Sequence, residues 1–390
     1  MGWIQKANAE WFLHNEYKRD GDVWDSHAGL DLHSKMVALK VSPSVVCLLS
    51  HTGKDKLFAC SGTIVECGDK ESDGTFVGII LTSASLLRCP SGAASLAPDI
   101  KVDVLLLDGK LLQGEVFAYD FHYNLSVIKI RSDAPLPTPS LRNLDESRPV
   151  TLHPVLGSTS SHHSDSFKIR PGDTVMALGR HYHSHSLVVA SGSFTIGLCK
   201  FGCKELLKAT CKMVTRYYIG GPLINRDGEV IGINFYHERY TPFLPINIAY
   251  RCLEHLKIQR SVNRPWLGVK LTNFYAVNLV DLEKIIQKFP HISEGVVVEE
   301  VANESPAKVA GILPDDVIVS CGGHSVRCCS EFFGIMWDKT RESVPVVVMR
   351  TSCGNRLMLT IDVGDTSEHR YNSWPIYSAL RRTCYGGPLK

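Results

Sequence analysis

The chain has 390 residues, which is enough for two or three domains with sizeable cores. Its 42 basic and 40 acidic residues leave a net charge of +2, so charge does not support nucleic acid or an anionic membrane as the main partner. No apolar run approaches the roughly 18 residues of a transmembrane helix, so no membrane span is predicted.

Two further features concern compartment and cofactors. The N-terminal residues lack the basic segment and long apolar stretch of a secretory signal, so we expect no signal peptide. An intracellular location is favoured, and the compartment stays open. The 13 cysteines are an odd number without the paired spacing of a zinc site, which favours reduced, mostly buried thiols. We therefore expect neither a metal nor a cofactor.

Residues 1–40 form the first predicted segment. Aromatic residues are interspersed with charges here, and residues 30–40 have the pattern of an amphipathic helix. The segment is predicted to be an N-terminal arm that either packs on the first domain or contacts another subunit.

Short apolar or alternating segments bounded by turn residues follow, which is typical of an all-β barrel or sandwich. The first group of predicted strands is 45–50, 57–66, 76–81, 101–107, 111–119 and 125–130. The second group is 173–178, 187–196, 212–215, 223–224 and 229–235, with a helix over 248–258. The Ser-rich residues 157–166 between the groups are predicted to be a surface loop.

A boundary is predicted at Arg264-Pro265, where a further module begins. Its predicted elements are a helix over 279–289, a strand over 295–301, a strand over 315–320 and a closing hairpin over 345–350 and 357–363. Ser305 followed by Pro306 has the pattern of a helix N-cap and first helical residue. Residues 366–390 form a predicted C-terminal tail whose sequence resembles no known module and whose role stays open.

Residues 217–234 carry the most informative motif. Gly220-Gly221 permits positive φ and close backbone approach, and Asp227-Gly228 supplies the tight turn of a hairpin. The stretch resembles the nucleophile segment of the HtrA/Deg (Do-like) serine proteases, and residues 305–316 resemble the signature of their PDZ domains. The resemblance covers approximately residues 43–363. It implies a mainly β fold, with a trypsin-like double β-barrel over 41–262 followed by a PDZ domain over 264–365.

The residues that would perform catalysis in this family are replaced. The nucleophile position is Ile219, the histidine position is Ser85 and the aspartate position is Asn124. Tyr217 stands at an oxyanion-loop glycine, whereas Gly220 is retained. A hydroxyl cannot take a proton at neutral pH as imidazole does, and an amide cannot stabilise an imidazolium. These replacements predict a pseudoprotease that acts as a binding scaffold or regulator.

The alternative is an active serine-type endopeptidase with a displaced nucleophile, which would degrade unfolded proteins in protein quality control. Ser61, Thr215 and His122 are the side chains considered as substitutes. His181, His183 and His185 alternate, so on a strand they would share one face and could bind zinc or copper. A solvent-facing loop is the favoured interpretation of that run.

The resemblance also implies a peptide site. In PDZ modules a ligand strand adds to a sheet edge and its carboxylate binds loop amides. The matching residues are Trp266, Leu267, Gly268 and Val269, with Phe332 or Phe333 as candidates to line the pocket. The implied partners are peptides or unfolded segments, and this family implies a homotrimer or a mixed oligomer with active members.

Overall fold

The computed structural model describes residues 29–89, 95–150, 166–197, 199, 201, 203–259, 262, 264–365, 372 and 374. Predictions for residues 1–28 and 157–165 lie outside the described residues. The chain divides into two compact units. The first contains Met1–Leu144, Arg170–Ser261 and Asn372–Lys390, and the second contains Asp145–Ile169 and Val262–Tyr371. Among the helices of the described residues, none has the length and apolarity needed to cross a bilayer.

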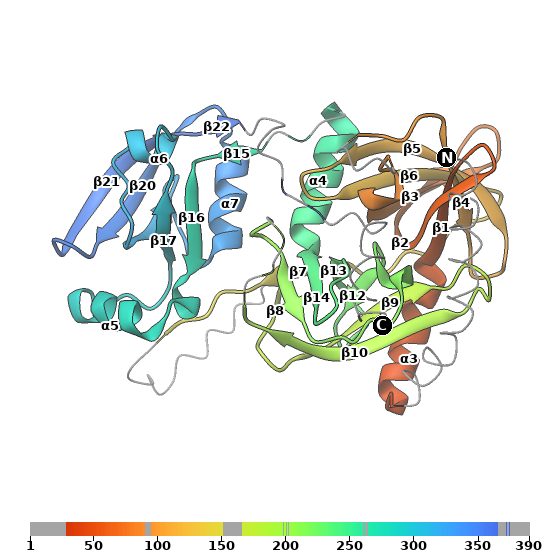
Figure 1. Ribbon diagram of the computed structural model, residues 1–390, viewed down its shortest axis with the longest axis horizontal. Helices are drawn as coiled ribbons and strands as arrows, with labels where there is room; N and C mark the ends of the chain where they lie inside the picture. The colour runs from red at the N-terminus through yellow and green to blue at the C-terminus, as the bar shows by residue number, and fades with distance from the viewer. Residues whose placement is uncertain are drawn as a thin grey trace, which may run out of the picture. The chain divides into compact units, whose positions relative to one another are not determined.

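The first unit begins with a helix and a closed barrel. Helix α3 (Leu32–Val41) starts at Asp31, whose carboxylate accepts a hydrogen bond from the Ser34 amide, and it confirms the predicted N-terminal helix. The barrel has the strand order β1-β2-β3-β6-β5-β4 (Figure 1). Its strands are β1 (Val45–Thr52), β2 (Asp55–Lys70), β3 (Phe76–Ser83), β4 (Ile100–Leu105), β5 (Leu111–Asp120) and β6 (Leu125–Ser132). All six predicted strands of this group are confirmed.

A second closed barrel follows in the order β10-β11-β14-β13-β12-β9, drawn in green in Figure 1. Its strands are β9 (Thr174–Arg180), β10 (Leu187–Thr195), β11 (Leu207–Ala209), β12 (Pro222–Ile224), β13 (Val230–Asn234) and β14 (Thr241–Pro245). Helix α4 (Ile246–Gln259) packs on β13 and β14, and it confirms the predicted helix over 248–258. The predicted strand over 212–215 is wrong, because those residues form no strand and β11 lies earlier in the chain.

The two barrels are joined by a buried charge. Arg180, at the end of β9, is fully buried, and its guanidinium donates to the carbonyls of Val45 at 2.6 Å, Ser42 at 2.7 Å and His185 at 2.8 Å. These bonds satisfy a group that would otherwise be costly to bury. They hold the start of β1 against β9 and therefore fix the interface on which the candidate site lies.

The second unit is an open sheet with helices. The sheet order is β16-β17-β18-β20-β21, so β16 is an edge strand. Its strands are β15 (Pro265–Trp266), β16 (Val269–Asn273), β17 (Val296–Val301), β18 (Asp316–Cys321), β19 (His324–Ser325), β20 (Ser343–Arg350), β21 (Asn355–Asp362) and β22 (Gly364–Asp365). Its helices are α5 (Leu279–Lys288), α6 (Pro306–Val309) and α7 (Cys329–Asp338). Ser305 caps α6 as predicted, since its hydroxyl accepts from the Lys308 amide at 3.2 Å.

A segment from between the barrels also belongs to this second unit. Strand β7 (Asn143–Asp145) pairs with β8 (Ser166–Lys168), and the residues after β7 pack on the sheet and helices of the second unit. The carboxylate of Glu146 is buried and accepts hydrogen bonds from the amide and hydroxyl of Ser330, at the start of α7. The Val150 amide donates to the Ser293 carbonyl at 2.8 Å. The segment therefore shares the core of a module that begins more than a hundred residues later.

Candidate functional site

The predicted nucleophile position, Ile219, lies at the junction of the two barrels and is occupied by an alkyl side chain. A single 3₁₀ turn, η3 (Arg216–Tyr218), ends at Ile219. The Ile219 side chain has no exposed surface and packs with Leu86 and Leu87 in the core of the first barrel. Its carbonyl accepts a hydrogen bond from the Ser61 amide at 2.9 Å. The residue at the predicted nucleophile position is thus part of a hydrophobic core.

The other two predicted triad positions, Ser85 and Asn124, contact each other directly. Ser85 lies on the 3₁₀ turn η2 (Ala84–Leu86), and Asn124 precedes β6 with φ of 55°. The Asn124 amide group donates to the Ser85 hydroxyl at 2.9 Å, and the Asn124 carbonyl accepts from the Ala84 amide at 2.9 Å. Both side chains are buried. The structure brings these two predicted residues together, but as a neutral hydrogen-bonded pair.

The two glycines of the motif are required by close packing. Gly220 has φ of 75°, and a Cβ there would lie 2.4 Å from the Thr82 hydroxyl. A Cβ on Gly221 would lie 2.2 Å from the Leu178 carbonyl. No real Cβ contact is that short, so only glycine fits at either position. The predicted positive φ and close approach are confirmed at Gly220.

The amides of this loop already have backbone partners. The Ile219 amide donates to the Arg216 carbonyl at 2.9 Å, the Gly220 amide to the Asn234 carbonyl at 2.8 Å and the Gly221 amide to the Tyr218 carbonyl at 3.1 Å. An oxyanion hole needs donors aimed at the position where the oxyanion develops. Tyr217 has no positive φ, and its buried ring packs edge-on against His181 at a centroid distance of 4.4 Å. In this arrangement the Ile219, Gly220 and Gly221 amides all donate to backbone carbonyls of the chain itself.

The hydroxyls considered as substitute nucleophiles are also enclosed. Ser61 is fully buried, donates to the Tyr217 carbonyl and accepts from the Arg180 amide at 2.8 Å. The Thr215 hydroxyl is buried and has no hydrogen-bond partner among the described residues. The His122 ring lies edge-on against Tyr123 at 4.7 Å. Ser61 therefore has a structural role, in which it joins β2 to β9 and to η3.

The sequence pattern does not indicate one serine–histidine contact that the structure contains. The Ser184 hydroxyl lies 2.9 Å from Nδ1 of His181, which also accepts from the Ser184 amide at 3.2 Å. His181 is buried and Ser184 is exposed, and both belong to the turn between β9 and β10. His183 and His185 are also exposed in this turn. The three histidines therefore do not share one strand face, and the solvent-facing loop interpretation describes His183 and His185.

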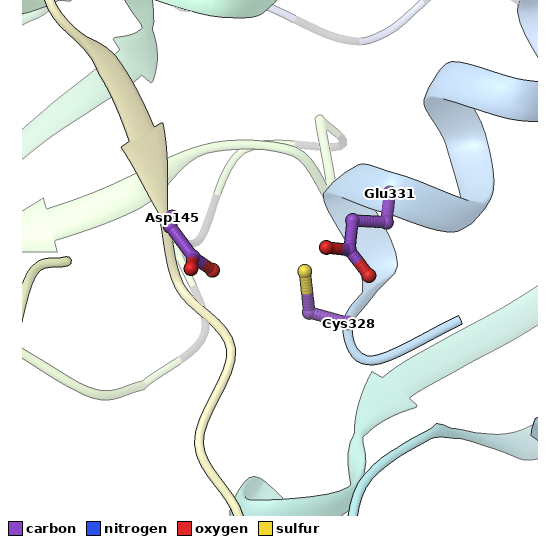
Figure 2. A group of neighbouring side chains, drawn as sticks. All are labelled: Asp145, Cys328 and Glu331. Carbon is purple, nitrogen blue, oxygen red and sulfur yellow. The ribbon is translucent and has the colours of Figure 1, made fainter. Parts of the chain in front are cut away.

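Figure 2 shows the three described residues whose potential ligand atoms lie within 4.8 Å of one another: Asp145, Cys328 and Glu331. Arg327 pairs with both carboxylates, at 3.6 Å from Asp145 and through its Nε at 2.8 Å from Glu331. Burial raises the pKa of the Cys328 thiol to about 12, so the sulfur stays protonated at neutral pH. The group is an ion-pair network that joins the last residue of β7 to α7.

The predicted peptide-binding loop connects two strands of the second unit. Gly268 has φ of 70°, and a Cβ there would lie 2.2 Å from the Ser305 Cβ. The Leu267 carbonyl accepts from the Ala307 amide at 3.1 Å, and the Gly268 carbonyl accepts from the Ala302 amide at 2.7 Å. Trp266 lies in β15, and Val269 begins the edge strand β16. The loop therefore has a fixed backbone next to an open sheet edge.

The two closed barrels and the glycine-rich hairpin define a trypsin-like peptidase fold. A family model described as a trypsin-like peptidase domain matches residues 60–233. The solved structure "HtrA-type protease AlgW with tripeptide" has a TM-score of 0.55 at 20% identity, and the match covers 85% of this chain and 96% of that one. The similarity to that structure supports the fold.

Curated relatives give the family. The chain is 32% identical over 319 residues to "Putative protease Do-like 14" of Arabidopsis thaliana, covering 78% of this chain and 63% of that relative. It is 28% identical over 344 residues to "Serine protease HTRA4" of Mus musculus, covering 83% of this chain and 62% of that relative. The chain thus spans less than two thirds of the length of these relatives. It belongs to the HtrA/Deg (Do-like) family of serine proteases and their homologues.

Proposed function

We propose that this chain is a catalytically inactive HtrA-type homologue that acts as a scaffold or regulator by binding peptides or unfolded protein segments. The observation that carries the proposal is the site itself: Asn124 and Ser85 hydrogen-bond to each other, and Ile219 is buried in the core. Acyl transfer by this family's route needs a nucleophile, a base that takes its proton and a group that orients the base. None of the three positions carries the required side chain.

The proposed ligand site is in the second unit, which we assign as a PDZ domain over 264–365. The Leu267 and Gly268 carbonyls are anchored to α6 and to the residue after β17. Because N–H and C=O point in opposite directions across a trans peptide, the Gly268 and Val269 amides point away from those anchors. Loop amides beside an open sheet edge suit a ligand strand ending in a carboxylate. A tripeptide accompanies AlgW in its solved structure, which supports peptide binding here.

The proposal also includes domain boundaries and an oligomeric state. We assign residues 41–262 to the protease-like domain, with Asp145–Ile169 set apart because that segment folds with the second unit, and we assign 1–40 to an arm and 366–390 to a tail. The chain would join a homotrimer or a mixed oligomer with active family members, and regulate rather than cut. Co-expression with an active relative, followed by native mass spectrometry, tests this directly. Separate homogeneous peaks without mixed species would refute the mixed oligomer.

The central experiment is digestion of unfolded casein. The natural chain is compared with a variant carrying Ser85→His, Asn124→Asp, Ile219→Ser and Tyr217→Gly. Near-ultraviolet circular dichroism verifies that the variant is folded. We expect the natural chain to be inert and to resist labelling by a serine-directed phosphonate, and we expect the folded variant to cut slowly. Cleavage by the purified natural chain would overturn the proposal.

A second candidate is the endopeptidase with a displaced nucleophile. Its specific support is the distance of 2.9 Å between the Ser184 hydroxyl and His181 Nδ1, which is within the range for a nucleophile and its base. Against it, the pair lies three residues apart in one turn, where such local contacts are common. If the natural chain cuts casein, Ser184→Ala decides between this pair and another nucleophile. Ser61→Ala is the matched control within the buried site.

A further inference from the structure

A described residue of the C-terminal tail lies beside the candidate site. Trp374 is only 5% exposed. Its ring lies 4.6 Å from that of Phe235 and 5.6 Å from that of Phe201, measured between centroids. Its indole N–H donates to the His122 carbonyl at 2.7 Å, and the Asn372 side chain donates to the same carbonyl at 3.0 Å. A tail residue is thus held by two rings and one shared acceptor.

These contacts come from both barrels and adjoin the triad positions. His122 lies two residues before Asn124, in the turn between β5 and β6. Phe235 directly follows Asn234, whose carbonyl accepts the Gly220 amide and whose own amide donates to the Gly221 carbonyl at 2.9 Å. Phe235, which contacts Trp374, therefore directly follows the residue that hydrogen-bonds to both glycines of the predicted nucleophile segment. All of these residues belong to the first unit.

We propose that Phe201, Phe235 and the His122 carbonyl form a binding subsite for a tryptophan-bearing peptide segment, and that Asn372 and Trp374 occupy it as an internal ligand. The groups that surround Trp374 suit an indole ring. Two aromatic rings, tilted by 46° and 44° to the indole, pack against it, and a carbonyl accepts its N–H, which is the pairing that a buried tryptophan requires. The inference does not depend on the chain being inactive.

The tether makes the internal ligand a strong competitor. A segment joined to its own site by a short linker has an effective concentration on the order of a millimolar. A free peptide of the same sequence at micromolar concentration would therefore bind poorly to the intact chain. It would bind once the internal segment is removed, so the site is accessible in trans only after the tail is released.

The test uses a fluorescein-labelled peptide with the sequence of residues 370–378, followed by fluorescence anisotropy. The full-length Trp374→Ala chain should bind it at least ten-fold more tightly than the natural chain. A peptide in which the tryptophan is replaced by phenylalanine should bind roughly ten-fold more weakly, because one net hydrogen bond corresponds to about that factor. Adding Phe201→Ala to the Trp374→Ala chain should abolish binding, whereas adding Phe333→Ala, in the second unit, should not.

A second variant tests the same proposal in case Trp374→Ala does not fold. A specific protease site replaces residues 366–370, and the chain is cut after it has folded with its own tail in place. The cut chain should bind the labelled peptide and the uncut chain should not. Equal binding by cut and uncut chains, absence of binding by the cut chain, or binding that survives Phe201→Ala would each overturn the proposal.

Discussion

Restoring the missing nucleophile alone should damage the fold, and the size of the damage follows from the burial of Ile219. The side chain is fully buried with Leu86 and Leu87. Truncating a buried isoleucine to alanine costs about 2–5 kcal/mol, so we expect about 3 kcal/mol for Ile219→Ala. Ile219→Ser should cost roughly 1 kcal/mol or more beyond that, because it also buries a hydroxyl.

Differential scanning calorimetry of the full chain measures this effect. For a unit of about 250 residues, 1 kcal/mol shifts the midpoint by roughly 2–4 °C, so Ile219→Ala should lower the melting of the barrels by about 6–12 °C. Ile219→Val is the matched control and should cost only about 1 kcal/mol. If Ile219→Ser melts within about a degree of the natural chain, the side chain is not packed in the core and our assignment of the nucleophile position fails.

Three further predictions concern other positions. Gly220→Ala should destabilise the barrels by about 2–5 kcal/mol, because a side chain there combines a positive φ with atomic overlap. The control Gly172→Ala, with φ of 91° but open space around it, should cost only about 1–2 kcal/mol. Equal costs in thermal unfolding would contradict the packing argument. Burial raises the pKa of the Glu146 carboxyl. Its contribution to stability is therefore complete below the unfolded pKa of about 4.3 and is lost as pH rises through the folded pKa. Relative to Glu146→Gln, the natural chain should lose stability as pH increases from 4 to 8, and a pH-independent difference in calorimetry would refute this. Gly268→Ala should abolish selection of C-terminal peptides from a phage-displayed library, and unchanged selection would remove this loop from the ligand site.

The barrels were predictable from the sequence because their strands are short apolar segments with local turn signals. β1 is a nearly continuous apolar run, and its residues from Val45 to Leu49 are buried in the structure. β14 was missed because Pro242 and Pro245 argue against a strand, yet the strand pairs with β13 and β11 through long-range register. Local patterns do not encode such pairing partners.

The sequence predicts which residues form the candidate site, but it does not give their environment. The resemblance to the family motif predicts Ser85, Asn124 and Ile219 as the triad positions, and the glycine turn beside them follows from backbone sterics. The bond between Asn124 and Ser85 joins residues 39 positions apart, and Trp374 reaches His122 across 252 positions. Contacts of that separation depend on the tertiary fold. The sequence therefore could not reveal that the tail contributes to the site.

The retained Gly220-Gly221 motif has a physical explanation that does not involve catalysis. A Cβ at either glycine would overlap β3 or β9, so the motif is needed to close the two barrels against each other whether or not a nucleophile follows. The three predicted catalytic positions carry no such requirement, since Ile219 packs in the core and Asn124 is hydrogen-bonded to Ser85. The shape of the site is therefore set by the glycines and not by the side chains at these three positions. The sequence features that identify the family are therefore those of the scaffold, and activity has to be judged from the three side chains that the scaffold holds.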